Sequence, residues 1–229
     1  VEAGEVVIAS GATLVLSGGS AALTLGGISE SANVLLSNSG TFTADASSTV
    51  YLNADNSNLL LSSSAESITF GNLVISPALA EDRTVVLSDN ISTLNINGNF
   101  TIAPSGSKIY TISFGNIVID FATTSVFTID STGTSTSVVT LPAIDLELAK
   151  IVVASGDSLD ASSVSNITLS GTSGTLLTQG GTFTAPTNLI MNPDAAVTLT
   201  SGTVSLVSLT LSPILNEDRV YTFGAGAMG

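Results

Sequence analysis

Short runs of alternating apolar and small polar residues recur along the whole chain and constrain its fold more than any other feature. Thr13–Leu16, Thr49–Leu52, Thr84–Leu87 and Ala196–Leu199 are examples. Each run is short and ends in a cluster of Gly, Ser, Asn or Asp, which is the pattern of β-strands separated by turns. The one candidate helix, Pro142–Val153, carries charges that suit a strand equally well, and we assign it to strand or loop. The sequence therefore predicts an all-β domain.

A second pattern is more specific: Asn, an apolar residue, any residue, and another apolar residue. It occurs seven times, at Asn33, Asn58, Asn72, Asn99, Asn116, Asn166 and Asn188. Several intervals are about 25 residues or about twice that, as in a repeat array, although the steps from 58 to 72 and from 99 to 116 are clearly shorter. A β-solenoid explains such a recurrence, because Asn tolerates a corner and its amide can bond the equivalent Asn one coil away. We interpret these residues as a ladder in a parallel, right-handed β-solenoid (β-helix). The alternative is a tandem β-sandwich in which Asn only marks turns.

A longer repeat lies on top of these patterns. Gly40–Ala44 returns as Gly181–Ala185, and Asn72–Arg83 resembles Ser208–Arg219, in the same order along the chain. We therefore expect residues 1–229 to form one elongated repetitive domain, with about 1.7 copies of a unit of about 140 residues and the second copy starting near residue 176. The second copy stops sooner after its Glu-Asp-Arg than the first. This indicates either a fragment of a longer array or a segment that a neighbouring subunit completes.

The charge balance narrows the choice of partners. The chain carries 18 acidic residues and only four basic ones, Arg83, Lys108, Lys150 and Arg219, for a net charge of −14. Nucleic-acid binding needs a basic surface that four scattered cations do not supply, so no nucleic-acid partner is expected. No apolar run reaches the roughly 20 residues of a membrane-spanning helix, so no membrane insertion is expected. No cofactor is expected either, and calcium binding by some of the carboxylates is the alternative to a purely solvating role.

The residue types argue against an enzyme. The chain has no His and no Cys, so the commonest general base and the commonest thiol nucleophile are both missing. The serious rival is a carbohydrate-acting β-helix, which works with carboxylates alone. Such sites usually add aromatic stacking surfaces, whereas this chain has no Trp and three Tyr. We expect no enzymatic activity. The acid pairs that the rival would use are Glu81/Asp82, Asp145/Glu147, Asp157/Asp160 and Glu217/Asp218.

The Glu-Asp-Arg blocks are the most distinctive polar feature. We interpret Arg83 and Arg219 as parts of a structural turn, each pairing with an acid of its own or the next coil. The alternative is a contact that joins subunits. Three N-glycosylation sequons also occur, at Asn90, Asn99 and Asn166.

The segments 73–102 (LVISPALAEDRTVVLSDNISTLNINGNFTI) and 209–229 (LTLSPILNEDRVYTFGAGAMG) resemble the repeats of large bacterial β-strand repeat surface proteins. More loosely, they are similar to filamentous-haemagglutinin and autotransporter-passenger segments. The resemblance implies a β-solenoid exported to the cell surface as a stalk, adhesin or filament, and it implies no catalytic residue set.

From these observations we expect a structural segment of an extracellular filament, stalk or surface sheath. Its partners would be copies of itself, joined head to tail through open strand edges, or further repeats of the same chain. One alternative is an adhesin, with binding loops in the least regular region, about 120–163. Another is a pilus-like subunit that donates residues 1–16 as a strand to its neighbour.

Overall fold

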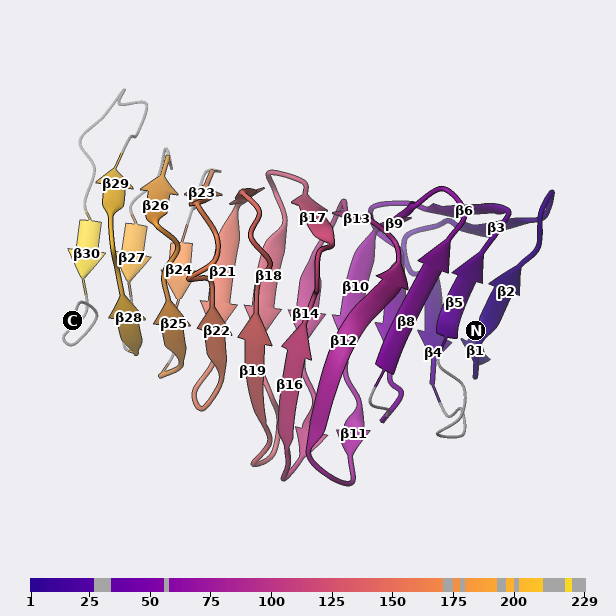
Figure 1. Cartoon of the computed structure of the whole chain (residues 1–229), viewed down its shortest axis with the longest axis horizontal. Coiled ribbons are helices and arrows are strands. Elements are labelled where there is room, and N and C mark those ends of the chain that lie inside the picture. The colour runs from indigo at the N-terminus through magenta and orange to yellow at the C-terminus, as the bar shows by residue number, and fades with distance from the viewer. Residues whose placement is uncertain are drawn as a thin grey trace.

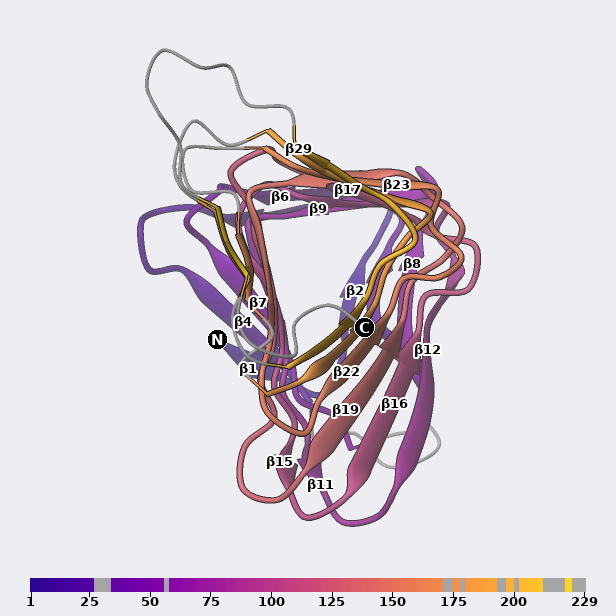
Figure 2. The ribbon, with the colours of Figure 1, turned by 90° about the vertical axis from the view of Figure 1, so that its left-hand side faces the viewer.

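The computed structural model describes residues 1–26, 34–55, 58–170, 175–177, 180–192, 197–199, 202–211 and 221–223; at 34, 58–60, 88–90, 175–177, 197–199 and 221–223 it describes the backbone alone. In these residues the chain forms 30 short strands and no helix. The strands stack into an elongated parallel β-solenoid, seen from the side in Figure 1. Its cross-section is roughly triangular, as Figure 2 shows along the axis.

Each coil contributes one strand to each of three walls, which we call A, B and C. Wall A contains β1 (Glu2–Ala3), β4 (Ala22–Leu25), β7 (Thr49–Leu52), β10 (Asn72–Ile75), β14 (Phe100–Ile102), β18 (Val126–Ile129), β21 (Lys150–Val153), β24 (Thr175–Leu177), β27 (Val197–Leu199) and β30 (Tyr221–Phe223). Wall B contains β2 (Val6–Ile8), β5 (Val34–Asn38), β8 (Asn58–Ser63), β12 (Arg83–Asn90), β16 (Ile109–Ser113), β19 (Thr136–Thr140), β22 (Ser158–Asp160), β25 (Thr182–Thr184) and β28 (Thr203–Ser205). Wall C contains β3 (Thr13–Leu16), β6 (Thr41–Ala44), β9 (Ser67–Phe70), β13 (Thr93–Ile96), β17 (Val118–Phe121), β20 (Leu146–Leu148), β23 (Asn166–Leu169), β26 (Asn188–Met191) and β29 (Leu209–Leu211).

The direction of winding follows from the order of the walls. In Figure 2, which looks from the end where β30 lies, the chain passes from wall A at the left to wall B at the right, over wall C at the top, and back to wall A. This path is anticlockwise while the chain advances toward the viewer, so the solenoid is right-handed, as the chirality of parallel crossovers favours. The prediction of a parallel β-solenoid is confirmed. The tandem β-sandwich alternative is wrong, because the paired strands are parallel, and the one antiparallel bridge in the described residues is isolated, between Ala154 and Gly180.

Alternation along each strand builds the core. Strands such as β7, β10, β13 and β18 bury every second residue, because successive side chains of a strand point to opposite faces. Register then stacks like on like: Leu73 pairs with Val50 in one neighbouring coil and with Phe100 in the other, and all three are buried. Burying one such side chain contributes about 1.5–3 kcal/mol. The interior is therefore a continuous apolar column held by three hydrogen-bonded walls.

Aromatic rings thicken this column in its middle. The ring of Phe100 stacks on that of Phe127 with centroids 5.2 Å apart, and meets the ring of Phe114 edge-on at 5.9 Å. Phe121 lies 5.9 Å from Phe127 and completes the cluster. Phe100, Phe114 and Phe121 belong to one coil, and Phe127 belongs to the next.

The coils differ in length. The register step from Val139 to Leu159 takes far fewer residues than the step from Val6 to Leu36. Part of the extra length in longer coils forms a lobe at the corner between walls A and B, where β11 (Ala78–Leu79) pairs with β15 (Ser105–Gly106); the lobe hangs below the walls in Figures 1 and 2. Gly133 follows Gly106 one coil later with a φ of 73°, and a Cβ there would lie 2.7 Å from the Gly106 carbonyl oxygen. The lobe therefore requires glycine at this corner.

Two regions whose structure the sequence left open form regular strands of the solenoid walls. Pro142–Val153, which we assigned to strand or loop, contains β20 and β21, one on wall C and one on wall A. The region 120–163, where the adhesin alternative placed binding loops, contains strands of all three walls in regular order.

The two copies of the long repeat lie on different walls. Gly40–Ala44 leads into β6 on wall C, whereas Gly181–Ala185 contains β25 on wall B. Asn72–Arg83 begins with β10 on wall A, whereas the described part of its second copy, 208–211, forms β29 on wall C. Counting strands, each second copy comes five full coils and two further walls after the first. The sequence repeat is therefore not a whole number of coils.

Candidate functional site

Side chains at the starts of strands tie several coils to the next, and they include most of the described Asn candidates. On wall A, Asn72 is the first residue of β10 and Asn99 directly precedes β14. The Oδ1 of Asn72 accepts the backbone N–H of Asn99, the equivalent residue one coil later, at 2.8 Å. The Oδ1 of Asn99 in turn accepts the N–H of Val126 at 3.0 Å. Asn72 also donates through Nδ2 to the carbonyls of Ala46 and Ser48 in the previous coil, at 3.3 and 3.1 Å.

The same junction occurs with Asp in place of Asn. Before β12, the Oδ1 of Asp82 accepts the N–H of Ile109 at 3.0 Å. Before β20, Asp145 accepts both the N–H and the Nδ2 of Asn166, each at 2.9 Å. In every case the acceptor belongs to one coil and the donor to the equivalent residue of the next. A pattern restricted to Asn missed Asp82 and Asp145; a search for Asn or Asp directly before a strand would have included them.

Wall C also contains the one Asn–Asn bond of the described ladder candidates. Asn188 pairs in register with Asn166 and donates its Nδ2 to the Oδ1 of Asn166 at 3.0 Å. This is the amide-to-amide contact that the ladder interpretation expected. At Asn72 and Asn99 the partner is the backbone N–H instead. Both the Nδ2 and the Oδ1 of Asn166 thus form a hydrogen bond, whereas Asn99, the other sequon residue whose side chain is described, is exposed.

The remaining Asn candidates do not join this arrangement. Asn116 lies exposed in the turn between β16 and β17, away from a strand start. Asn58 begins β8, but its side chain lies outside the described residues, as does that of the sequon residue Asn90. Asn33 lies outside them entirely.

Arg83 forms the polar centre of the lobe between walls A and B. Its Nε donates to Asp55 Oδ1 at 2.7 Å and its Nη1 pairs with Glu81 Oε1 at 2.6 Å. Asp55 belongs to the preceding coil, and its Oδ2 also accepts the N–H of Ala80 at 2.9 Å. Burial opposes ionisation of Asp55, but these hydrogen bonds and the charge of Arg83 outweigh it and hold the pKa of Asp55 below its ordinary value. Arg83 therefore pairs with one acid of its own coil and one of the preceding coil. The equivalent Arg219 lies outside the described residues.

Two carboxylates that sequence reasoning did not single out as structural have a similar role. Asp157 is 1% exposed and accepts three hydrogen bonds from the preceding coil: from Ser131 N–H at 2.9 Å, Ser131 Oγ at 2.6 Å and Ser137 N–H at 2.7 Å. Asp45, at the corner between walls C and A, accepts the N–H of Gly18 in the preceding coil at 2.8 Å.

Asp45 also organises its own corner. Its Oδ1 accepts the Oγ and N–H of Ser47 and the N–H of Ser48, at 2.8, 3.1 and 2.7 Å. With the Gly18 contact these hydrogen bonds, that of Ser47 first, hold the pKa of Asp45 below its ordinary 3.8. Burial acts in the opposite direction and is outweighed.

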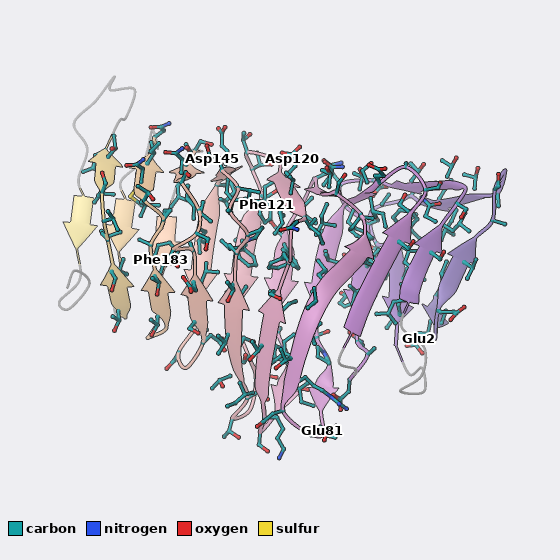
Figure 3. The ribbon with its side chains drawn as sticks, in the orientation of Figure 1. Glu2, Glu81, Asp120, Phe121, Asp145 and Phe183 are labelled. Carbon is teal, nitrogen blue, oxygen red and sulfur yellow. The ribbon has the colours of Figure 1, made fainter. Side chains whose placement is uncertain are left out.

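The acids of two pairs of the carbohydrate-acting alternative form hydrogen bonds to different partners. Asp157 points into the stack, whereas Asp160 is half-buried and binds the N–H of Ser162 at 2.9 Å. Asp145 binds Asn166, whereas Glu147 accepts the Oγ of Ser170 at 2.8 Å. The last pair, Glu217 and Asp218, lies outside the described residues. Figure 3 shows Asp120 and Asp145 on the outside of wall C.

A search of the described residues for metal and membrane features gives two results. No group of three or more Asp or Glu side chains there is placed to hold a metal ion. No helix in the same residues is long and apolar enough to span a membrane.

Comparison with known proteins adds no relative. No family model matches the chain, and neither a curated protein nor a solved structure matches it. The resemblance to surface-protein repeats therefore stays a prediction.

Proposed function

We propose that this chain is a structural segment of an extracellular filament, stalk or surface sheath. The observation that carries the proposal is the continuity of the stack: wall B runs through nine strands in one sheet and wall A through eight. Such a stack transmits load along its axis through hydrogen bonds between coils, which all point along that axis. A nine-strand wall at about 4.8 Å per strand is about 40 Å long.

The polar junctions support a mechanical role. Asn72, Asn99, Asp82, Asp145 and Asp157 each bond an adjacent coil through a side-chain oxygen, and Asp145 and Asp157 do so through both oxygens. Each such bond contributes about 0.5–1.5 kcal/mol net. Catalytic carboxylates must instead keep an oxygen available to a substrate.

The backbone groups of the first described coil indicate how a further coil would add to the stack. In the described residues, β1, β2 and β3 pair on one side only, with β4, β5 and β6. Val7 and Val15 on this coil are 65% and 53% exposed. Their neighbours Ile8 and Leu16 direct their carbonyls to the next coil, accepting bonds from Ser39 and Asp45, so the N–H groups of Val7 and Val15 face the unpaired side. We propose that a further coil, of the same chain type, extends the stack here.

Residues 1–16 do not form the single donor strand of the pilus-like alternative. They form three strands of two to four residues, each on a different wall. An end-to-end stack uses all three edges together, which a single donated strand does not.

Electron microscopy of the purified chain at rising concentration, compared with a Val7→Pro/Val15→Pro variant, tests the proposal. Proline removes two N–H donors from the free edge and leaves the bonds to the next coil intact. The matched control is Val7→Thr/Val15→Thr, which keeps both donors. We expect the parent chain and the control to form rods longer than about 40 Å, and the proline variant to remain as single particles. Single particles of the parent chain at every concentration, or rods of the proline variant, would contradict the proposal.

A further inference from the structure

Wall C is interrupted at two places where walls A and B are continuous. In the described residues, wall C consists of three separate sheets: β3–β6, β9–β13–β17 and β20–β23–β26–β29. No ladder joins β6 to β9 or β17 to β20, although both pairs of strands lie close together. The same coil steps are paired on the other walls, through β7–β10 and β5–β8 at the first interruption and β18–β21 and β16–β19 at the second; the β5–β8 ladder contains one register shift.

The first interruption is a real opening in the wall. A hollow of about 230 Å³ lies between β6 and β9, lined among others by Thr41, Phe42, Ser67 and Thr69. Backbone bonds resume at both corners. Ser64 N–H donates to the Asn38 carbonyl at 2.8 Å on the wall B side, and Asn72 N–H donates to the Ser48 carbonyl at 2.7 Å on the wall A side. The gap is therefore confined to wall C.

Local residues account for the first gap. Glu66, which directly precedes β9, has a φ of 56°, a left-handed conformation that is costly for a residue with a side chain. Phe42 and Phe70 still pack edge-on across this step, with ring centroids 5.7 Å apart. The corner at Glu66 is therefore the feature that would direct β9 away from β6.

Charge accounts for the second gap. Asp120 is the exposed residue between buried Ile119 and Phe121 on β17, and Glu147 is the exposed residue between buried Leu146 and Leu148 on β20. The two acids therefore occupy equivalent positions in adjacent coils. Like charges opposite each other destabilise a strand pair.

We propose that these two interruptions are hinges at which the rod bends in one plane, opening and closing wall C while walls A and B hold. A coil step joined by two ladders costs less to open than one joined by three, and the two wall C interruptions lie on the same side of the rod. In the described residues wall A has one further step without a ladder, from β24 to β27. Bending at the two wall C steps is therefore directional. The inference concerns a single chain and holds whether or not chains assemble.

Paired spin labels test the first hinge directly. The chain has no Cys, so a double-cysteine variant carries only the two labels. Val15→Cys/Val118→Cys spans four coil steps on wall C across the first interruption, and Val7→Cys/Ile109→Cys spans four steps on continuous wall B. All four residues are exposed valine or isoleucine, so the pairs are matched. We expect a distance distribution at least twice as wide for the wall C pair. Equal widths would overturn the hinge.

Hydrogen exchange of the unmodified chain gives an independent readout that needs no variant. Glu66 and Phe70 direct their carbonyls to β13, so the alternate residues Ser67 and Thr69 direct their N–H groups to the first interruption. Residues 93–96 belong to a strand paired on both sides. We expect at least tenfold faster amide exchange at Ser67 and Thr69 than in 93–96. For the second hinge, Glu147→Gln should narrow the distribution of distances between spin labels placed on β17 and β20. It should leave the distance distribution across the first hinge unchanged. Equal exchange rates, or no effect of Glu147→Gln at the second gap, would contradict the proposal.

Discussion

Replacing Asn72 with Ala tests whether the strand-start junctions hold the coils together. The change removes three hydrogen bonds, from Asn99 N–H and to the carbonyls of Ala46 and Ser48. At about 0.5–1.5 kcal/mol net per bond, and with partial replacement by water at this half-buried position, we expect a loss of about 2–3 kcal/mol. With a urea dependence of about 2–3 kcal/mol per molar, the unfolding midpoint should fall by about 1 M.

Asn116 provides the matched control, because it has the same local sequence pattern but lies exposed in a turn. Asn116→Ala should change stability by no more than about 0.5 kcal/mol. Asn72→Asp should fall between the two, because it keeps the Oδ1 acceptor and loses the Nδ2 donors. The measurement is urea unfolding followed by circular dichroism, with hydrogen exchange of residues 99–102 as a local readout. Similar midpoints for Asn72→Ala and Asn116→Ala would refute the junction argument.

Three further predictions concern the core, a corner and pH. Phe100→Ala should cost about 3–5 kcal/mol because the ring is fully buried in the aromatic cluster, whereas Thr101→Ala on the outer face should cost less than about 0.5 kcal/mol, both read by urea unfolding. Gly71→Ala should destabilise the fold by about 1–3 kcal/mol, because a Cβ there would collide with the backbone carbonyl oxygen of Asp45. A Cβ at Gly19 meets no neighbouring atom, so Gly19→Ala should be neutral. Equal melting temperatures of the two variants would contradict this expectation. Hydrogen bonds lower the pKa of Asp45, so its ionised form stabilises the fold above about pH 4. That contribution disappears as the pH falls below 3.8, the ordinary pKa of this carboxyl. Asp45→Asn should therefore lose less stability than the parent chain between about pH 5 and pH 2.5.

Much of the fold could be predicted because the alternation of apolar and polar residues, and the sequence spacing between strands, indicate it directly. The apolar positions of β7, β10 and β14 are one strand period apart, and they recur in register from Val50 to Leu73 to Phe100, which is enough to indicate a parallel stack. The Asn pattern also reported real strand starts, at Asn72, Asn166 and Asn188. Its two irregular steps have a simple cause. Asn58 begins a strand of wall B and Asn72 one of wall A, and Asn116 lies in a corner, so those steps cross between walls.

The polar junctions were harder to predict, because they depend on which residues become neighbours across a coil. Asp55 lies 28 residues before Arg83, and Asp157 lies 26 residues after Ser131. Coil steps differ in length along the chain, so no fixed spacing identifies such partners. The interruptions of wall C likewise depend on corner geometry at Glu66 and on the alignment of Asp120 with Glu147. Neither leaves a pattern in a single sequence.

The offset between copies of the long repeat has a geometric consequence. Each unit advances five coils and two of the three walls. Successive copies of any feature are therefore related by a screw rotation of about two thirds of a turn along the winding, which equals one third of a turn in the opposite sense. In a chain built from such units, an element like the Arg83 lobe would point to each of three sides in turn. It would return to its first side after three units, or about 17 coils, which is about 80 Å along the axis at about 4.8 Å per coil. The repeat would thus distribute one contact evenly around a rod, as a threefold screw does.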